Sequence, residues 1–478
     1  MPTDINYNHV EGVHVLLGTV AMQGHMNPVL KLAKFLASKG VHVTVATTDV
    51  ARHRLLKQNN SGIVAASGNT KIQLEFYSDG LSLEFDRNGN VGAFVDSLHT
   101  TGYENLSNLI DSINKDRKIS CLVFNPFMPW MADVAADHGI PCAALWIQAS
   151  ASYSIYYRYF DNPTLFGNLE NPTGQVIELP GLPILEVKDL PTLMLPSCPA
   201  PIKSQLFQFY QNMNKVNWVL GTSFYELEEE IVDSMSTLFP IHPIGPLVSP
   251  FLLGKEEEET ADSLKIDLFK VEDSCIDWLD KQQPSSVIYI AFGSLIVLTQ
   301  DHIDNIANAL KNINRPFLWV MKPPEKGSKS KIGELPYGFV DETKEKGVVV
   351  EWCAQEKVLM HKSLACFMTH VGWNSTLETV VCGVPVVAYP QWTDQPTNAR
   401  LIEDVFKVGV SVRQGEDGVA SGEEVEKCIM EVIEGPKAEE IKKRALELKE
   451  AAKKAVQNGG SSDKNIDQFI REISAKRV

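Results

Sequence analysis

The sequence has no excess of positive charge and no long hydrophobic run. Its 44 lysine and arginine residues are outnumbered by 60 aspartate and glutamate residues, which gives a net charge of -16. Such a surface repels phosphate backbones, so we expect no nucleic-acid partner. No apolar run approaches the roughly 18 residues that a membrane span needs, and the N-terminus contains no apolar signal core. These absences predict a soluble, cytoplasmic protein without a membrane span.

Paired cysteines and the common nucleotide-binding motifs are also missing. The eight cysteines are scattered, without a Cys-x-x-Cys pair or a metal-ligand spacing, so we expect reduced thiols in the core. The first strand expected in the C-terminal half is followed by AFGSLIVL rather than GxGxxG, and no GxxxxGK[ST] occurs. The sequence therefore argues against a nicotinamide-dependent oxidoreductase and against a P-loop enzyme.

The chain does contain β-branched runs that alternate with amphipathic segments. Residues 13–20 and 41–47 are predicted strands, and the helix between them is predicted to begin at Asn27 and Pro28, since Asn is a good N-cap and Pro suits the first helical position. The alternation restarts in the second half with a predicted strand at 286–292. Each succession of strand, helix and strand implies a parallel sheet, so the predicted class is α/β.

At 478 residues the chain exceeds one ordinary domain. We predict an N-terminal domain at 1–246, a linker at 247–270, a C-terminal domain at 271–457 and an amphipathic tail helix within 458–478. The linker contains consecutive glutamates at 256–259, which cannot pack and indicate a solvated segment. Two α/β halves that face each other would place a ligand crevice between them.

Residues 352–395 concentrate the polar side chains that a ligand site would need. A predicted strand ends at His370, and Asn374 and Ser375 open the helix that follows. The free N–H groups and the dipole at a helix N-terminus attract phosphate. Glu378, one turn into that helix, could accept hydrogen bonds from two ribose hydroxyls. Ser375 and Glu378 also fit a capping box, which would explain both residues without a ligand.

Other residues of the C-terminal half are also compatible with either a structural role or a ligand-binding role. Trp352 ends a predicted strand and could be a core residue or a flat surface for a base. Asp394 and Gln395 could cap the next helix or bind sugar hydroxyls. Ser294, after another predicted strand, could donate to the same anion as His370. The residues alone therefore permit a nucleotide-sugar site without requiring one.

In the N-terminal half, His25 directly follows the first predicted strand in the segment QGHMNP. A lone histidine in this position is by default a structural residue, and a general base is the alternative.

The stretch 352–395 resembles the signature box of plant secondary-product UDP-glycosyltransferases, from its first Trp to its last Gln, and the resemblance covers essentially the whole chain. It implies a GT-B fold, in which two Rossmann-like domains with parallel sheets face each other and the tail helix crosses back onto the first domain. It also implies UDP-glucose as the donor, because a terminal Gln such as Gln395 usually goes with glucose. Ala354 and Val371 depart from the usual Pro and Cys, and neither departure removes a contacting side chain.

The resemblance assigns roles by motif. Trp352 would stack on uracil, Gln355 would lie beside the nucleotide, and Glu378 would hold the ribose. Four residues would hold the diphosphate: Ser294, His370, Asn374 and Ser375. Three would line the sugar: Trp373, Asp394 and Gln395. His25 would be the general base that deprotonates the acceptor.

Asn125 stands where this family usually has an Asp that partners the histidine, in the segment CLVFNPFMPW. An amide orients an imidazole but cannot stabilise the imidazolium by charge, so His25 should be a weaker base. A carboxylic acid with a pKa of about 4 is ionised at pH 7 and needs no strong base. The NPFxPW segment and the C-terminal end of the chain resemble the branch that glucosylates hydroxycinnamic and gallic acids to sugar esters.

The predicted function is an inverting, UDP-glucose-dependent glucosyltransferase of small plant phenolics, in particular phenolic carboxylic acids. The alternatives are O- or C-glucosylation of polyphenols with the same donor site, and a nucleotide-sugar-binding protein without turnover. We expect no metal and no other cofactor, since no acidic pair ends a strand near the phosphates; the helix terminus and His370 would carry the leaving-group charge. We also expect a monomer. The loops at 80–100 and 150–205 give no indication of the acceptor.

Overall fold

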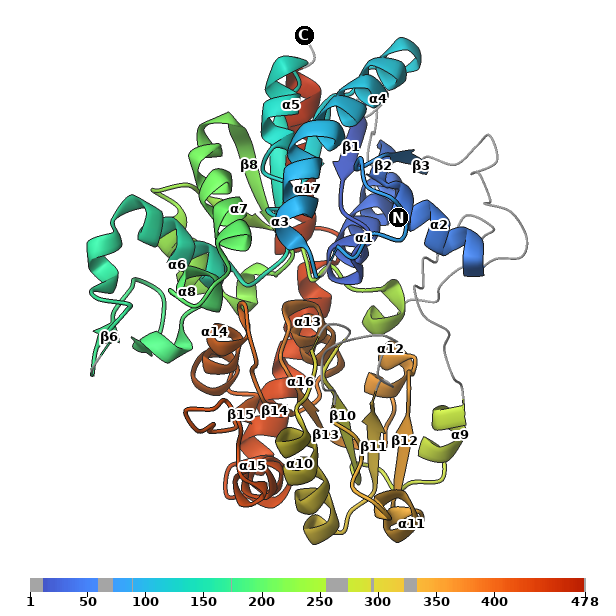
Figure 1. Cartoon of the computed structure of the whole chain (residues 1–478), viewed down its shortest axis with the longest axis vertical. Helices are drawn as coiled ribbons and strands as arrows, with labels where there is room; N and C mark the ends of the chain where they lie inside the picture. Colours follow the sequence, from blue (N-terminus) through green and yellow to red (C-terminus); the bar gives the residue numbers. More distant parts are fainter. Residues whose placement is uncertain are drawn as a thin grey trace.

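The structure, a computed structural model, describes residues 12–58, 72–87, 89–172, 174–254, 274–293, 296–321 and 333–476. They form two halves, each built on a parallel sheet, which lie one above the other in Figure 1. A short antiparallel hairpin of β6 (Val176–Ile177) and β7 (Leu185–Glu186) stands apart from both sheets. The predicted α/β class is confirmed. The glutamates at 256–259 of the expected linker lie outside the described residues.

The first sheet has seven strands in the order β3-β2-β1-β4-β5-β8-β9, and all its pairs are parallel. The bounds are β1 (His14–Gly18), β2 (His42–Thr48), β3 (Ile72–Tyr77), β4 (Cys121–Phe124), β5 (Cys142–Trp146), β8 (Val216–Gly221) and β9 (Ile241–Pro243). The strand order reverses between β1 and β4. In open α/β sheets the crevice beyond the carboxyl ends of the strands at such a reversal is where ligands bind.

The second sheet has six parallel strands in the order β12-β11-β10-β13-β14-β15. The bounds are β10 (Val287–Ala291), β11 (Phe317–Val320), β12 (Gly347–Val350), β13 (Leu364–Thr369), β14 (Val386–Ala388) and β15 (Gly409–Ser411). Its order reverses between β10 and β13, so this half has its own ligand crevice at the ends of those two strands.

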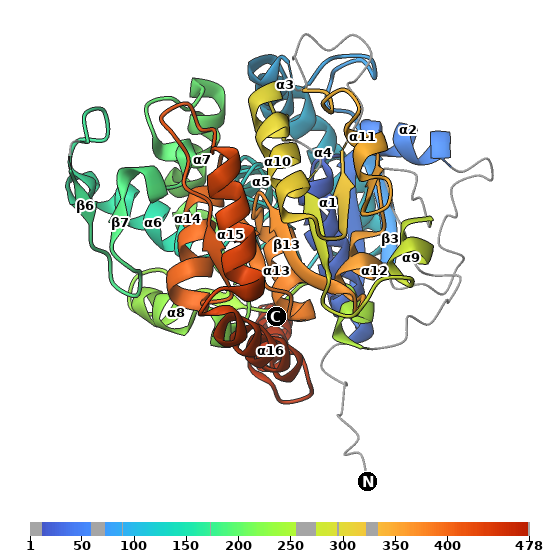
Figure 2. The same cartoon turned by 90° about the horizontal axis from the view of Figure 1, so that it is seen from below.

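Helices cover both faces of each sheet, because successive side chains along a strand point to opposite faces and both faces are apolar. In β10, Tyr289 packs in one core cluster with α13 (Trp373–Cys382) and α16 (Ala438–Ala455), while Ile288 and Ile290 pack in another with α10 (Gln300–Ile313) and α15 (Gly422–Glu434). Figure 2 shows α10 and α15 beside each other.

The last helix, α17 (Ser461–Ala475), lies on the first sheet although it follows the second one along the chain (Figure 1). Its apolar side chains share a core cluster with β1, β2 and α1 (Gln23–Ser38). Lys39 forms ion pairs with Asp463 and Asp467, and the Trp218 indole donates to Glu472. The crossing back that the resemblance implied is therefore present.

The remaining α-helices complete the two halves and the cleft wall. They are α2 (Asp49–Gln58), α3 (Val91–Ser97), α4 (Tyr103–Asp116), α5 (Met131–Asp137), α6 (Ser150–Asp161), α7 (Ala200–Gln211), α8 (Glu229–Met235), α9 (Ser274–Leu279), α11 (Phe339–Thr343), α12 (Gln355–Leu359) and α14 (Gln395–Arg400). Two π-helical segments, Leu98–Gly102 and Leu401–Phe406, continue α3 and α14. Within the described ranges, every helix is too short or too polar to cross a membrane.

The predicted start of the first helix is wrong. Helix α1 begins at Gln23 with Met22 as its N-cap residue, and Pro28 lies inside it. The carbonyl of Met22 already accepts from the N–H groups of His25 and Met26, at 3.0 and 2.8 Å. Pro28 has no N–H, so the carbonyl four residues earlier, that of Gly24, receives no helical hydrogen bond from it.

Candidate functional site

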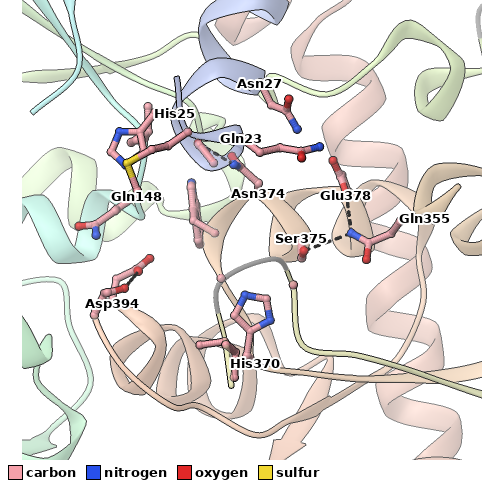
Figure 3. Close-up of a pocket in the computed structure, with 18 of the residues that line it drawn as sticks. Gln23, His25, Asn27, Gln148, Gln355, His370, Asn374, Ser375, Glu378 and Asp394 are labelled. Carbon is pink, nitrogen blue, oxygen red and sulfur yellow. Dashed lines mark hydrogen bonds between the residues drawn. The ribbon is translucent and has the colours of Figure 1, made fainter. Parts of the chain in front are cut away.

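A cleft of about 2180 Å³ lies between the two halves. It is lined by the segments that follow β1, β4 and β5 in the first sheet and β10, β13 and β14 in the second. A pocket for one small ligand usually measures about 300–1000 Å³, so this cleft has room for two. In Figure 3, His25 and Asp394 lie toward one side, Gln355 and Glu378 lie toward the other, and Asn374 lies between them.

His25 and Asn125 meet at the strand reversal of the first sheet. His25 lies in the first turn of α1, just after β1, and Asn125 directly follows β4. The Nδ1 atom of His25 is 3.2 Å from the side-chain oxygen of Asn125. That oxygen also accepts the N–H of Phe127 at 3.1 Å, and the Asn125 amide nitrogen donates to the Thr19 hydroxyl at 3.3 Å. The sequence predicted this pair, and the structure brings it together.

The contacts of Asn125 determine which nitrogen of His25 carries the proton. The Phe127 N–H can only donate, so the oxygen of the amide must face both it and His25. Nδ1 of His25 is therefore the donor, and Nε2 keeps a lone pair. Asn125 is fully buried and cannot rearrange freely. Thr19 and Phe127, which hold the amide, were not predicted, because no local pattern distinguishes them from core residues.

His25 is held in its neutral form. Burial lowers the pKa of His25 below its ordinary value, and the hydrogen bond to Asn125 only partly opposes this effect. The ring also packs edge-on against Phe127, with centroids 5.5 Å apart. A neutral imidazole with a free Nε2 in a cleft is a group that can accept a proton from a ligand.

In the second half, α13 begins at Trp373 with Gly372 as its N-cap residue. Ser375 is thus inside the helix, and the capping-box alternative for Ser375 and Glu378 is wrong. The side-chain nitrogen of Gln355 instead donates to Ser375 at 3.1 Å and to Glu378 at 2.9 Å. Figure 3 shows these two bonds. A helix N-terminus, a hydroxyl and a carboxylate are therefore presented together to the cleft.

Lys31 of α1 reaches across the cleft to the same carboxylate. Its Nζ atom lies 3.2 Å from Glu378 and 3.7 Å from Glu356. Glu378 is only 8% exposed, and this cation compensates part of the cost of burying its charge. Lys31 could not be predicted from the sequence, since nothing in a single helix shows a partner that lies 347 residues away.

His370 follows β13 at the strand reversal of the second sheet. Burial lowers its pKa to about 4, so the ring is neutral near pH 7. A Cβ atom added to Gly372 would lie 2.6 Å from Nε2 of His370, and one added to Gly293 would lie 2.7 Å from Cε1. Both glycines are therefore required for the ring to fit beside the backbone. Ser294, predicted to donate beside His370, lies outside the described residues.

Asp394 and Gln395 line the cleft beyond His370. Burial raises the pKa of Asp394, whose carboxylate accepts from Asn398 at 2.8 Å. The Gln395 side-chain oxygen accepts the N–H groups of Gln391 and Trp392, at 2.9 and 3.0 Å. These bonds fix both side chains at the cleft surface.

Two tryptophans complete the set that the sequence predicted. Trp373 is buried at the start of α13, and its indole N–H has no hydrogen-bond partner among the described residues. Trp352, on the segment after β12, is half-buried and lines the cleft. Every predicted site residue that the structure describes thus belongs to this cleft or, for Asn125, holds a residue that does.

The chain is similar to known proteins along nearly its full length. The family model described as UDP-glucoronosyl and UDP-glucosyl transferase matches residues 274–451. UDP-glycosyltransferase 84B1 of Arabidopsis thaliana is 48% identical over 465 residues, which are 96% of this chain and 98% of that protein. Gallate 1-beta-glucosyltransferase 84A24 of Punica granatum is 41% identical over 98% of this chain and 90% of its own length. The crystal structure of Os79 from O. sativa in complex with UDP matches with a TM-score of 0.82 at 30% identity, over 96% of this chain and 100% of that one.

Proposed function

This chain belongs to the family of UDP-glucoronosyl and UDP-glucosyl transferases and has their GT-B fold, and on that premise we propose that it transfers glucose from UDP-glucose to the carboxylate of small phenolic acids. The product is a β-glucose ester. The observation that carries the proposal is the neutral partner of His25: a fully buried amide, Asn125, holds the imidazole at 3.2 Å where a carboxylate would make it a stronger base.

The donor occupies the side of the cleft lined by the second half. In this proposal Trp352 stacks on uracil, with Gln355 beside the nucleotide, and Glu378 accepts from the ribose hydroxyls. The diphosphate lies at the N-terminus of α13, where four residues donate to it: Ser294, His370, Asn374 and Ser375. Trp373, Asp394 and Gln395 line the glucose. The positions of the described members along one cleft support this assignment.

The reaction is a displacement at the anomeric carbon. A carboxylate oxygen of the acceptor attacks this carbon from the face opposite the diphosphate, the bond to the diphosphate oxygen breaks, and the electron pair leaves with UDP. The attack inverts the α-linked donor to a β-glucoside. The acceptor is already ionised at neutral pH, so no proton has to move. The helix N-terminus and the neutral His370 stabilise the charge that develops on the diphosphate.

A phenol acceptor would require a general base at the same site. Its proton must pass to Nε2 of His25 as the new bond forms. The imidazolium that results has an amide rather than a carboxylate beside it, in a position where burial already disfavours the charged ring. Relatives whose names state an acid acceptor, gallate 1-beta-glucosyltransferase and cinnamate beta-D-glucosyltransferase, are 41% and 39% identical to this chain, and this supports the choice of acceptor.

The test compares two acceptors of similar size, cinnamic acid and a phenol without a carboxyl group, with UDP-glucose as the donor. We expect transfer to the acid to be faster, with a product that mild base cleaves. His25→Ala should reduce turnover of the phenol more than turnover of the acid. An acid-labile O-glycoside or a product stable to both acid and base would instead indicate O- or C-glucosylation. Absence of UDP release with every phenolic would indicate a binding protein without turnover.

Three minor parts of the proposal are tested alongside. The reaction requires no metal, so EDTA should leave the rate unchanged. The protein is a monomer, which size-exclusion chromatography with light scattering would measure. It acts in the cytoplasm, which fractionation of cells that express it would test.

A further inference from the structure

Tyr156 carries a buried hydroxyl for which the described part of the chain supplies no hydrogen-bond partner. It lies on α6, its side chain is fully buried, and it lines the cleft. Its hydroxyl makes no hydrogen bond to any residue that the structure describes. Two neighbouring tyrosines behave differently: Tyr153 donates to the carbonyl of Phe239 at 3.1 Å, and Tyr210 donates to the carbonyl of Tyr153 at 3.3 Å. A buried polar group left unpaired at a cleft is the group that a ligand would satisfy.

Gln205 on α7 presents a second hydrogen-bonding group to the cleft. It is 5% exposed and lines the cleft. Its side-chain oxygen lies 3.0 Å from Nε2 of His99, in the π-helical segment after α3. The amide nitrogen makes no hydrogen bond within the described part of the chain. Because His99 occupies the oxygen, the end of the amide that stays available is the N–H donor.

Apolar side chains make up much of the cleft lining contributed by the first half. They include Phe94, Phe127, Trp146, Leu193, Ile202 and Leu206. The ring of Tyr156 packs edge-on against Trp146, with centroids 6.0 Å apart. In an apolar pocket a small number of polar groups determines which ligand fits and how it lies.

The two groups lie on elements that belong to a different part of the first sheet from His25. In the first sheet α6 follows β5 and α7 precedes β8, and these strands are two and three places from β1, which His25 follows. At the usual spacing of neighbouring strands, β5 and β8 themselves lie about 10 and 14 Å from β1. Phe127 contacts both His25 and Phe94, and α3, which carries Phe94, contacts α7, which carries Gln205. A planar acceptor with its attacked oxygen at His25 would extend along these side chains.

The hydroxyl of Tyr156 keeps its proton. Burial first, and then the nearby Asp394 carboxyl and Cys198 thiol, raise the pKa of Tyr156 well above its ordinary value. The group can therefore donate to a ligand oxygen as well as accept from a ligand hydroxyl.

We propose that the Tyr156 hydroxyl and the Gln205 amide form a second recognition point, which binds an oxygen substituent at the far end of an aromatic acceptor. The favoured acceptors then carry two oxygen functions at opposite ends, as hydroxylated phenylpropanoids and polyphenols do. This inference rests on the proposed function and adds to it which phenolic acids are preferred.

The test compares cinnamic acid with para-hydroxycinnamic acid, which differ only in the remote hydroxyl. The wild-type protein should prefer the hydroxylated acid by about tenfold in kcat/KM. Tyr156→Phe keeps the ring and should abolish most of that preference, and Gln205→Leu should reduce it. Because Tyr156→Phe removes an unpaired buried hydroxyl, its Tm should be equal to or higher than that of the wild type.

The matched control is Tyr153→Phe, which removes a hydroxyl that is paired within the protein. It should lower the Tm and leave the preference between the two acids unchanged. The inference is overturned if Tyr156→Phe lowers the Tm, or if it slows both acids equally. If the wild type glucosylates neither acid, the proposed acceptor class is refuted independently of the recognition point. The same variants are then compared on benzophenones with one and with two para-hydroxyl groups, where an unchanged preference overturns the recognition point.

Discussion

Replacing Asn125 by Asp would give His25 the charged partner that it lacks. The new carboxylate would occupy a fully buried position with one oxygen 3.2 Å from Nδ1 of His25. It would keep the hydrogen bond from the Phe127 N–H, and the Thr19 hydroxyl could rotate to donate to its other oxygen. The substitution therefore changes the charge at this position while it preserves the shape and most of the contacts.

The expected effect on His25 follows from this distance. Two unit charges 3.2 Å apart attract each other by about 1 kcal/mol in water and about 5 kcal/mol at the effective dielectric of a protein interior. Since one pKa unit corresponds to about 1.4 kcal/mol, the pKa of His25 should rise by roughly one to three units once the cost of burying the carboxylate is subtracted. Burial holds that pKa below its ordinary value in the wild type, so His25 in the variant should titrate at a higher pH than in the wild type.

The assay is the pH dependence of kcat/KM for a phenol and for an aromatic acid. The rate with the phenol falls as the pH drops through the pKa of His25, because the protonated ring is no base. This acidic limb should move to higher pH in Asn125→Asp, and above it phenol turnover should rise by about tenfold or more. The kcat/KM for the acid should stay unchanged or fall, because the new charge at position 125 repels the carboxylate of the acid.

Asn125→Leu is the matched control, since it removes the amide without adding charge. It should leave the acidic limb at or below its wild-type position and should slow the phenol. An acidic limb that stays in place in Asn125→Asp would refute the charge argument. An equal gain for the phenol and the acid would refute the link between Asn125 and the choice of acceptor.

Three further predictions concern the donor side and the tail helix. The pKa of His370 is lowered to about 4, so between pH 6.5 and 4 the unfolded chain binds a proton that the folded chain does not. As the pH falls through this window, the wild type should therefore lose up to about 3 kcal/mol more of its free energy of unfolding than His370→Gln loses. Urea denaturation at several pH values measures this difference, and parallel curves for the two proteins would exclude the effect. Glu378→Gln should weaken UDP binding about 10- to 100-fold, as measured by calorimetry. Glu356 contacts the same lysine, and Glu356→Gln should change UDP binding by less than about threefold. Equal losses of affinity in the two variants would assign the effect to the lysine. Asp463 is the more buried of the two aspartates that pair with Lys39, so Asp463→Asn should lower the free energy of unfolding by about 2 kcal/mol. The Asp467 side chain is 33% exposed, so Asp467→Asn should lower it by less than about 1 kcal/mol. The reverse order would contradict the link between burial and the strength of these ion pairs.

The donor side of the site could be predicted from the sequence because its parts follow one another along the chain. β13 leads directly into α13, and β14 leads into α14. In a parallel sheet the carboxyl ends of such neighbours meet at one edge. The polar residues after these strands, His370 and Asp394 among them, therefore had to come close together.

Local rules failed where a distant residue supplied the partner. Ser375 and Glu378 have the spacing of a capping box, but Glu378 pairs with Lys31 and Gln355. In both interactions the energy comes from contacts that no window of neighbouring residues contains. A rule based on spacing can only report what an isolated helix would do.

The acceptor side of the site could not be predicted from the sequence for a different reason. The region 150–205, expected as loops, contains α6 and the start of α7. The spacing of Ile202, Leu206 and Phe209 after a proline was a helix signal that the abundance of proline obscured. That the Tyr156 hydroxyl has no partner among the described residues could not be predicted from the sequence, because it becomes visible only when all the hydrogen bonds around it are known.

Pro28 connects the error in the helix start to the chemistry of the cleft. A proline inside a helix cannot donate to the carbonyl four residues earlier, which in α1 is that of Gly24. This carbonyl accepts instead from the Asn374 side chain across the cleft, at 3.0 Å. The amide of Asn374 has a second N–H, which in the proposed donor arrangement would bind a phosphate oxygen while the first is still bound to Gly24. Asn374 would then contact both the leaving group and the helical turn that carries His25, and Pro28 removes one helical hydrogen bond that would compete for the Gly24 carbonyl.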